Sequence, residues 1–115
     1  MIFLQICWGV NFLNWMNIIH FDLHSSNIFI DDRDPNNIIV KIGDFSKSRH
    51  IPDNKRSDCK NDEITLICRP PELIEGLLSG RAADTWAIGN LLYYMMSFSY
   101  PFGDPSNKSE YENNV

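Results

Sequence analysis

Positive charge is scarce in this 115-residue sequence, which has 10 lysine and arginine residues against 15 aspartate and glutamate residues. The formal net charge is −5, and the first basic residue along the chain is Arg33. Proteins that bind nucleic acid neutralise phosphates with clustered lysine and arginine side chains. The charge balance therefore argues against a nucleic-acid partner.

Cysteine is also scarce, because the chain has only Cys7, Cys59 and Cys68. Their spacing fits no metal-binding pattern, and an odd number of cysteines cannot all pair within one chain. These features indicate a reduced chain, which predicts an intracellular protein of the cytoplasm or nucleus.

Long apolar runs are absent as well. The N-terminal stretch is largely apolar, but Gln5, Asn11 and Asn14 interrupt it within the roughly 20 residues that a bilayer crossing needs. Unlike a signal peptide, it has no positively charged start and no clear small-residue cleavage site. We therefore expect no membrane partner. Apolar side chains at helical spacing instead predict a helix over residues 2–16, buried on most sides.

Two isoleucine-rich segments, residues 28–30 and 38–42, predict two β-strands. Residues 31–37 between them are dense in turn-forming side chains, so the two strands should form a hairpin. Residues 46–63 are polar and lack a clear period, which predicts a long loop.

Proline and glycine divide the second half of the chain. Pro71 can begin a helix, and a short helix over residues 72–75 should end at Gly76. A longer helix is predicted over residues 83–96, with apolar side chains on nearly every side, which indicates burial. Residues 106–115 are polar, and we expect them to form a frayed tail.

Two polar groupings accompany the predicted strands. Asp22 precedes Asn27 by five residues just before the first strand, and Asp44 follows the second strand. Transfer of a phosphoryl group to a hydroxyl needs a group that orients the hydroxyl and accepts its proton, together with oxygen ligands for Mg²⁺. Carboxylates and a carboxamide suit these tasks, although each alone would be an ordinary turn residue.

The order of four motifs resembles the protein kinase catalytic domain. Residues 20–27, with the sequence His-Phe-Asp-Leu-His-Ser-Ser-Asn, resemble the catalytic loop H-R-D-L-K-x-x-N. Residues 44–46 resemble the metal-binding D-F-G motif. Residues 65–73 resemble the substrate-positioning segment that ends in A-P-E, and residues 84–89 resemble the D-x-W-x-x-G start of a buried helix in the kinase C-lobe.

The resemblance implies a mainly α fold with a small β-hairpin, corresponding to the core of a kinase C-lobe truncated at both ends. Residues 1–105 would be a partial kinase domain with an activation segment over residues 44–72, and residues 106–115 a polar tail. No glycine-rich loop, strand lysine or paired helix glutamate precedes the catalytic loop in this sequence. We therefore expect the chain to represent less than half of a kinase domain.

The resemblance also implies roles for individual residues. Asp22 is the expected catalytic base, and Asn27 and Asp44 are the expected Mg²⁺ ligands. Phe29 would lie under the adenine ring of ATP, and Thr65 would bond to the catalytic aspartate. Five further positions are expected to complete or support the site. His24 would lie near the transferred phosphoryl group, and His20 and Phe45 would belong to the stack between the lobes. Asp84 would be a buried acceptor of catalytic-loop N–H groups, and Glu72 would pair with an arginine from a later helix, which this sequence does not contain.

Four residues depart from the family pattern. Phe21 replaces the arginine that pairs with a phosphorylated activation loop, which argues against control by a single phosphate there. His24 replaces the lysine that contacts the transferred phosphoryl group, and an imidazole is a weaker partner than an ammonium at pH 7. Ser46 replaces the glycine of D-F-G and restricts that backbone, and Cys68 stands where a tyrosine is common. These changes bear on catalytic strength rather than on the fold.

The predicted function is transfer of the ATP γ-phosphoryl group, with Mg²⁺, to serine or threonine of a protein substrate, under a regulatory protein. Residues 64–73 look most like the cyclin-dependent-kinase-like branch. By itself the chain is expected to be inactive.

Three alternatives stay open, and one of them is a helical domain whose matches to the kinase motifs are coincidental. A pseudokinase or truncated binding module would accommodate Phe21, His24 and Ser46. Small-molecule kinases of the aminoglycoside or choline kinase type share H-x-D-x-x-x-x-N, but they lack the segments around Thr65 and Asp84.

Overall fold

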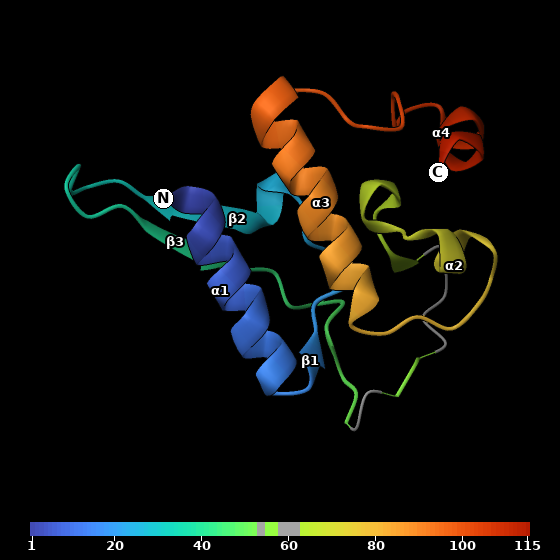
Figure 1. Cartoon of the computed structure of the whole chain (residues 1–115), viewed down its shortest axis with the longest axis horizontal. Coiled ribbons are helices and arrows are strands. Elements are labelled where there is room, and N and C mark those ends of the chain that lie inside the picture. The colour runs from blue at the N-terminus through green and yellow to red at the C-terminus, as the bar shows by residue number, and fades with distance from the viewer. Residues whose placement is uncertain (53–54, 58–62) are drawn as a thin grey trace.

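Two long helices and two small antiparallel sheets organise the protein. The computed structural model describes residues 1–52, 55–57 and 63–115. Helix α1 and helix α3 lie side by side, with the β2–β3 hairpin at one end and the short helices α2 and α4 on the other side (Figure 1). In chain order the elements are α1 (Ile2–Trp15), β1 (Ile18–Ile19), a 3-10 turn (Ser25–Asn27), β2 (Ile28–Asp31), β3 (Ile39–Ile42), β4 (Arg49–His50), a second 3-10 turn (Leu66–Cys68), α2 (Pro71–Ile74), α3 (Ala82–Ser97) and α4 (Lys108–Asn114).

The predicted hairpin is confirmed. Strands β2 and β3 pair antiparallel, with Ile28 opposite Ile42 and Asp31 opposite Ile39. A second, shorter pair joins β1 to β4, with Ile18 opposite His50. This second pair brings the segment that follows Asp44 back against the entrance to the catalytic-loop motif.

The helix boundaries also agree with the sequence signals. Helix α2 begins at Pro71, and Gly76 follows it with φ of 76°, a left-handed conformation that glycine adopts without a side-chain clash. Helix α3 ends at Ser97, and Phe98 adopts the left-handed conformation directly after it.

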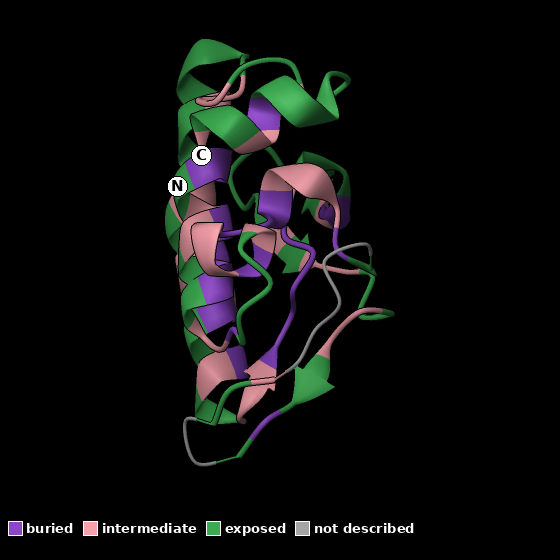
Figure 2. Cartoon of the chain, turned by 90° about the vertical axis from the view of Figure 1, so that its right-hand side faces the viewer, coloured by how far each residue is buried: buried purple, intermediate pink, exposed green. Residues whose placement is uncertain are grey.

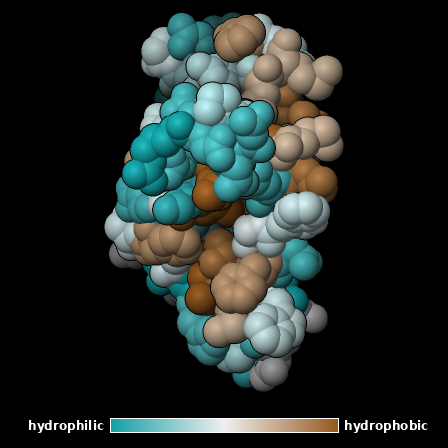
Figure 3. Space-filling model, turned by 90° about the vertical axis from the view of Figure 1, so that its left-hand side faces the viewer, coloured by the Kyte–Doolittle hydropathy of each residue, from teal (hydrophilic) through white to brown (hydrophobic). Residues whose placement is uncertain are grey.

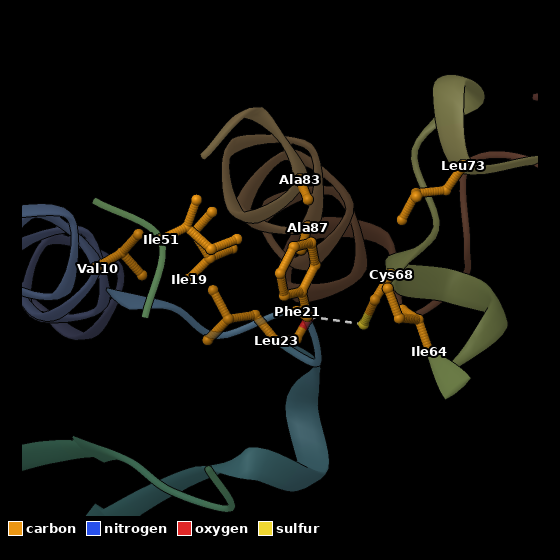
Figure 4. Packing of buried hydrophobic residues seen from close by; sticks show 10 residues of the cluster. All are labelled: Val10, Ile19, Phe21, Leu23, Ile51, Ile64, Cys68, Leu73, Ala83 and Ala87. Atoms are coloured by element: carbon orange, nitrogen blue, oxygen red, sulfur yellow. Dashed lines mark hydrogen bonds between the residues drawn. The ribbon is translucent and has the colours of Figure 1, made fainter. Parts of the chain in front are cut away.

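The hydrophobic core joins α1, the catalytic-loop segment, α3 and the start of α2. Figure 4 shows Phe21 directed toward Ala83 and Ala87 of α3, with Cys68 and Ile64 on the other side. The Cys68 thiol donates to the Leu23 carbonyl at 3.2 Å. Residues 20–24 are therefore packed directly against the core, through Phe21 and Leu23.

Neither long helix is buried on most of its sides, so that prediction was wrong. Helix α1 buries only Ile6, Val10 and Leu13, whereas Trp8 is 63% exposed and Trp15 is 75% exposed. Buried residues follow one side of the long helices and exposed residues the other (Figure 2). Hydrophobic side chains reach the surface beside a hydrophilic cluster in Figure 3. An apolar helix face is buried only where another element packs on it. Among the described residues, other elements pack on one face of each long helix and leave the opposite face exposed.

The expectation of a frayed tail was also wrong, because Lys108–Asn114 form helix α4. Asn107 caps this helix by accepting the Glu110 N–H, and Tyr111 is only 1% exposed. The Tyr111 ring meets the Phe102 ring edge-to-face, with 6.0 Å between ring centroids. One buried aromatic residue thus anchors an otherwise polar segment.

Two of the three cysteines lie among the described residues. Cys7 is half-buried and Cys68 is buried, and neither forms a disulfide; Cys59 lies outside the described residues, as does part of the expected loop over residues 46–63. Within the part of the chain that the structure describes, no helix is both long enough and apolar enough to span a bilayer.

Candidate active site

The backbone that carries Asp22 is fixed by a residue distant in sequence. Asp84, at the start of α3, is fully buried and accepts the N–H of His20 at 2.8 Å and the N–H of Phe21 at 3.0 Å. Burial raises the pKa of Asp84, and the two backbone hydrogen bonds oppose that rise. Phe21 adopts φ of 64°, which turns its side chain into the core. Asp84 therefore lies where the resemblance places it.

The Asp22 carboxylate is the centre of the site. Its Oδ2 atom lies 3.0 Å from the Lys47 ammonium and 3.7 Å from His24 Nε2, and its Oδ1 accepts the Thr65 N–H at 3.3 Å. Burial raises the pKa of Asp22, but the hydrogen bonds from Thr65 and Lys47 and the nearby positive charge outweigh burial. The net pKa lies below its ordinary value, so Asp22 is ionised and accepts hydrogen bonds at neutral pH.

The Asn27 side chain contacts both the backbone and the carboxylate of Asp22. The Asn27 amide nitrogen donates to the Asp22 backbone carbonyl at 2.8 Å, which assigns the other amide atom, Oδ1, as an oxygen available to a ligand. Across the site, Asp44 is exposed, and its Oδ1 accepts the Ser46 hydroxyl at 2.6 Å and the Ser46 N–H at 3.2 Å. These two hydrogen bonds hold the pKa of Asp44 below its ordinary value.

The donors present fit Mg²⁺. Mg²⁺ is a hard cation that proteins bind through one or two carboxylates or carbonyls together with substrate phosphates. Asp44 offers a carboxylate and Asn27 an amide oxygen, which matches that pattern. Among the described residues, no group of three or more histidine, cysteine, aspartate or glutamate side chains is placed to hold a metal ion.

His20 links the two candidate loops. Its Nδ1 accepts the Asp22 N–H at 3.2 Å, so its Nε2 carries the proton and donates to the Gly43 carbonyl at 2.9 Å. The His20 ring also meets the Phe45 ring edge-to-face, with 4.9 Å between centroids. The predicted contact between His20 and Phe45 is therefore present in the structure.

Phe29 lies on β2 and is 55% exposed. A Cβ atom at Gly43 would come within 2.5 Å of that ring, so glycine at this position lets the ring pack across the second strand. The exposed face of Phe29 is available to a flat apolar ligand.

The structure adds a contact at each of two further positions. Glu72, for which the sequence was expected to offer no arginine partner, accepts a hydrogen bond from the Ser79 hydroxyl at 2.6 Å. Ser46 was expected to restrict the loop, but the left-handed residue of this turn is Asp44, with φ of 55°. The Ser46 side chain instead orients the Asp44 carboxylate.

Sequence reasoning missed Lys47. Besides its contact with Asp22, its ammonium donates to the Thr65 hydroxyl at 3.1 Å. The available signal was a lysine three residues after Asp44 in a chain whose catalytic-loop motif has histidine in place of lysine.

A family model described as the protein kinase domain matches residues 1–115. The chain belongs to the protein kinase family. A kinase structure supports the same relationship: a chain in the crystal structure of the yeast RNA Pol II CTD kinase CTDK-1 complex superposes with a TM-score of 0.80 and is 36% identical. That match covers 97% of the present kinase chain and 35% of the other chain.

Several serine/threonine kinases are similar in sequence. Mouse serine/threonine-protein kinase Nek3 is 33% identical over 100 residues, covering 87% of this kinase chain and 19% of the relative. Aurora kinase B of Drosophila melanogaster is 33% identical over 107 residues, covering 93% and 30%. CTD kinase subunit alpha of Saccharomyces cerevisiae is 39% identical over 92 residues, covering 79% and 16%.

The kinase chain thus spans less than a third of the length of these three relatives. They are named as members of different kinase groups, so the cyclin-dependent-kinase-like branch stays a prediction. The structural match extends to both long helices and both sheets, because it covers nearly the whole chain.

Proposed function

We propose that these residues form the C-lobe side of the active site of a protein serine/threonine kinase, with Asp22 as its catalytic base. The observation that carries the proposal is the set of contacts around Asp22. An ionised carboxylate, held by Lys47 and Thr65, lies beside the amide of Asn27. Such a carboxylate can orient a substrate hydroxyl and accept its proton.

In the proposed reaction, a serine or threonine hydroxyl of a protein substrate attacks the γ-phosphorus of ATP. A new oxygen–phosphorus bond forms, the bond to the ADP oxygen breaks, and the hydroxyl proton passes to Asp22. Asn27 and Asp44 would hold Mg²⁺, which supplies positive charge to the phosphates. The exposed ring of Phe29 would pack against adenine, and Thr65 would keep Asp22 in place.

A second lobe would supply the opposite side of the nucleotide site, so we propose that the 115 residues alone transfer phosphate very slowly. Phosphoryl transfer depends on positioning and on electrostatic stabilisation from all sides of the nucleotide. We further propose an intracellular protein with a regulatory partner. The unpaired Cys7 and Cys68, among the described residues, support the location, and the similarity to a kinase solved as part of a complex supports the partner.

The test compares Asp22→Asn and Asp44→Asn in the full protein, with Asp32→Asn as an exposed hairpin control. Loss of the base in Asp22→Asn should lower kcat by about 10²- to 10⁴-fold while ATP affinity changes little. Asp44→Asn should weaken Mg²⁺-dependent ATP binding as well as turnover, and Asp32→Asn should leave both unchanged.

The alternative is a pseudokinase, which the replacement of the catalytic-loop lysine by His24 favours. The same experiment separates the two functions. A wild-type protein that binds a partner but transfers no phosphate would favour the pseudokinase. An Mg²⁺–ATP affinity in Asp44→Asn identical to that of wild type would contradict the role proposed for Asp44, and a wild-type kcat in Asp22→Asn would contradict the role proposed for Asp22.

A further inference from the structure

Position 24, which carries a lysine in the family, holds the shorter imidazole of His24, whose Nε2 lies 3.7 Å from Asp22 Oδ2. The Asn27 amide nitrogen, whose identity is fixed by its bond to the Asp22 carbonyl, lies 3.2 Å from His24 Nε2. An amide nitrogen can only donate, so Nε2 is the acceptor in this contact. The His24 imidazole is therefore directed to the Asn27 amide, and the lysine ammonium that the family has at this position is absent.

The Lys47 ammonium lies at the centre of the same site although it comes from a different loop. It is 3.0 Å from Asp22 Oδ2 and 3.1 Å from Thr65 Oγ1. An ammonium has three N–H donors, and these two contacts account for two of them. The Lys47 side chain is 33% exposed, whereas the Asp22 side chain is 5% exposed. The cation thus lies on the solvent side of the buried base, where a substrate must approach.

The surroundings of Lys47 suit an anionic group. A surface pocket lined by Ser46, Lys47, Ser48, Arg49 and Glu63 opens there. Arg49 pairs with Glu63 at 2.8 Å, which offsets the acidic residue of the lining. Lys47 therefore lies between the base and an open pocket, in a position to meet a phosphoryl group.

We propose that Lys47 is a catalytic residue that contacts the transferred phosphoryl group and takes the role of the lysine that the family has at position 24. The inference rests on the proposed kinase function. As the hydroxyl oxygen bonds to the γ-phosphorus and the ADP oxygen leaves, negative charge is shared among the phosphoryl oxygens. Lys47 keeps its protons and donates a hydrogen bond to one of these oxygens, while Asp22 accepts the hydroxyl proton.

The experiment measures steady-state kinetics of four variants of the full protein. Lys47→Met should lower kcat by about 10²-fold, the usual effect of removing one preorganised donor to a transition state, with the KM for ATP nearly unchanged. Lys47→Arg keeps the charge and should lose less. Lys41→Met removes an exposed lysine from β3 and should match wild type.

The decisive variant is the double substitution His24→Lys with Lys47→Met. It returns a lysine to the catalytic-loop position while removing the one in the other loop. If the reaction needs a cation at this place, kcat of the double variant should be at least about tenfold higher than kcat of Lys47→Met. That is the size of effect expected for one such donor.

A second readout does not depend on turnover. ADP with aluminium fluoride and Mg²⁺ mimics the phosphoryl group in flight, and Lys47→Met should weaken its binding far more than it weakens the binding of ADP alone. Equal losses for both ligands, or wild-type kcat in Lys47→Met, would overturn the role of Lys47 alone. Absence of phosphate transfer by the wild type would instead overturn the proposed function and this inference together.

Discussion

The buried carboxylate of Asp84 accepts the backbone N–H of His20 at 2.8 Å, although the two residues lie 64 positions apart in the chain. The other Asp84 oxygen accepts the N–H of Phe21. Both N–H groups belong to the segment that leads directly into Asp22. The first turn of α3 therefore fixes the backbone that positions the proposed base.

Replacing Asp84 by alanine should destabilise the protein by about 3 kcal/mol, because each buried N–H that loses its acceptor costs about 1–3 kcal/mol. Asp84→Asn keeps the side-chain volume and one acceptor oxygen, so it should lose less. Urea unfolding followed by tryptophan fluorescence measures both variants. Wild-type stability in Asp84→Ala would contradict the anchoring role.

Tyr111 offers a matched pair of substitutions in α4. Its ring is buried, but its hydroxyl has no hydrogen-bond partner among the described residues. Tyr111→Ala should cost about 3–5 kcal/mol through lost packing. Tyr111→Phe keeps the ring and removes an unpaired polar group, so it should be neutral or stabilising by about 1 kcal/mol. Equal losses in the two variants would contradict ring burial as the anchor.

The same tyrosine predicts sensitivity to alkali. Burial raises the pKa of Tyr111 to about 12 from the ordinary value of 10.0. The unfolded chain then ionises first, so the contribution of Tyr111 to stability is intact below pH 10 and is lost as pH rises toward 12. Thermal melts between pH 9 and 12 should show a smaller alkaline loss in Tyr111→Phe than in wild type.

Phe21 predicts independence from phosphorylation of the activation segment. Its side chain is 2% exposed and packs in the core, so it offers no cation to a phosphate. Treatment of the active full protein with phosphatase should therefore change kcat by less than about twofold, since a phosphate acts by creating new charge-assisted hydrogen bonds. Loss of most activity after treatment would show that another cation receives a phosphate.

The outer face of α1 predicts self-association of the isolated 115-residue chain. Trp8, Phe12 and Trp15 are more than half exposed and lie on one face at helical spacing. Exposed apolar patches of this kind promote association. Sedimentation velocity should detect oligomers that the double variant Trp8→Glu with Trp15→Glu disperses. Asn11→Glu adds charge to the same helix without removing an aromatic ring and should not disperse them.

Local pattern was sufficient for several parts of this protein. The turn formers between two isoleucine-rich runs predicted the β2–β3 hairpin, which the structure confirms with Ile28 opposite Ile42. Pro71 and Gly76 marked the ends of α2 because each restricts or permits a particular backbone conformation. Four ordered motifs indicated the kinase family, and the family comparison confirms it. The catalytic roles assigned to Asp22, Asn27 and Asp44 stay predictions.

Sequence alone determined the hairpin and the starts of α1, α2 and α3, because each depends on residues that are neighbours along the chain, and the order of four local motifs indicated the family. Tertiary structure decided which helix faces were covered, since apolar residues surround α1 but core elements reach only one side of it. It also decided that α4 forms around one buried tyrosine and that Lys47 meets Asp22 and Thr65. The lysine contact joins three segments, 25 and 18 residues apart, and such a meeting depends on how the chain folds back rather than on any local pattern.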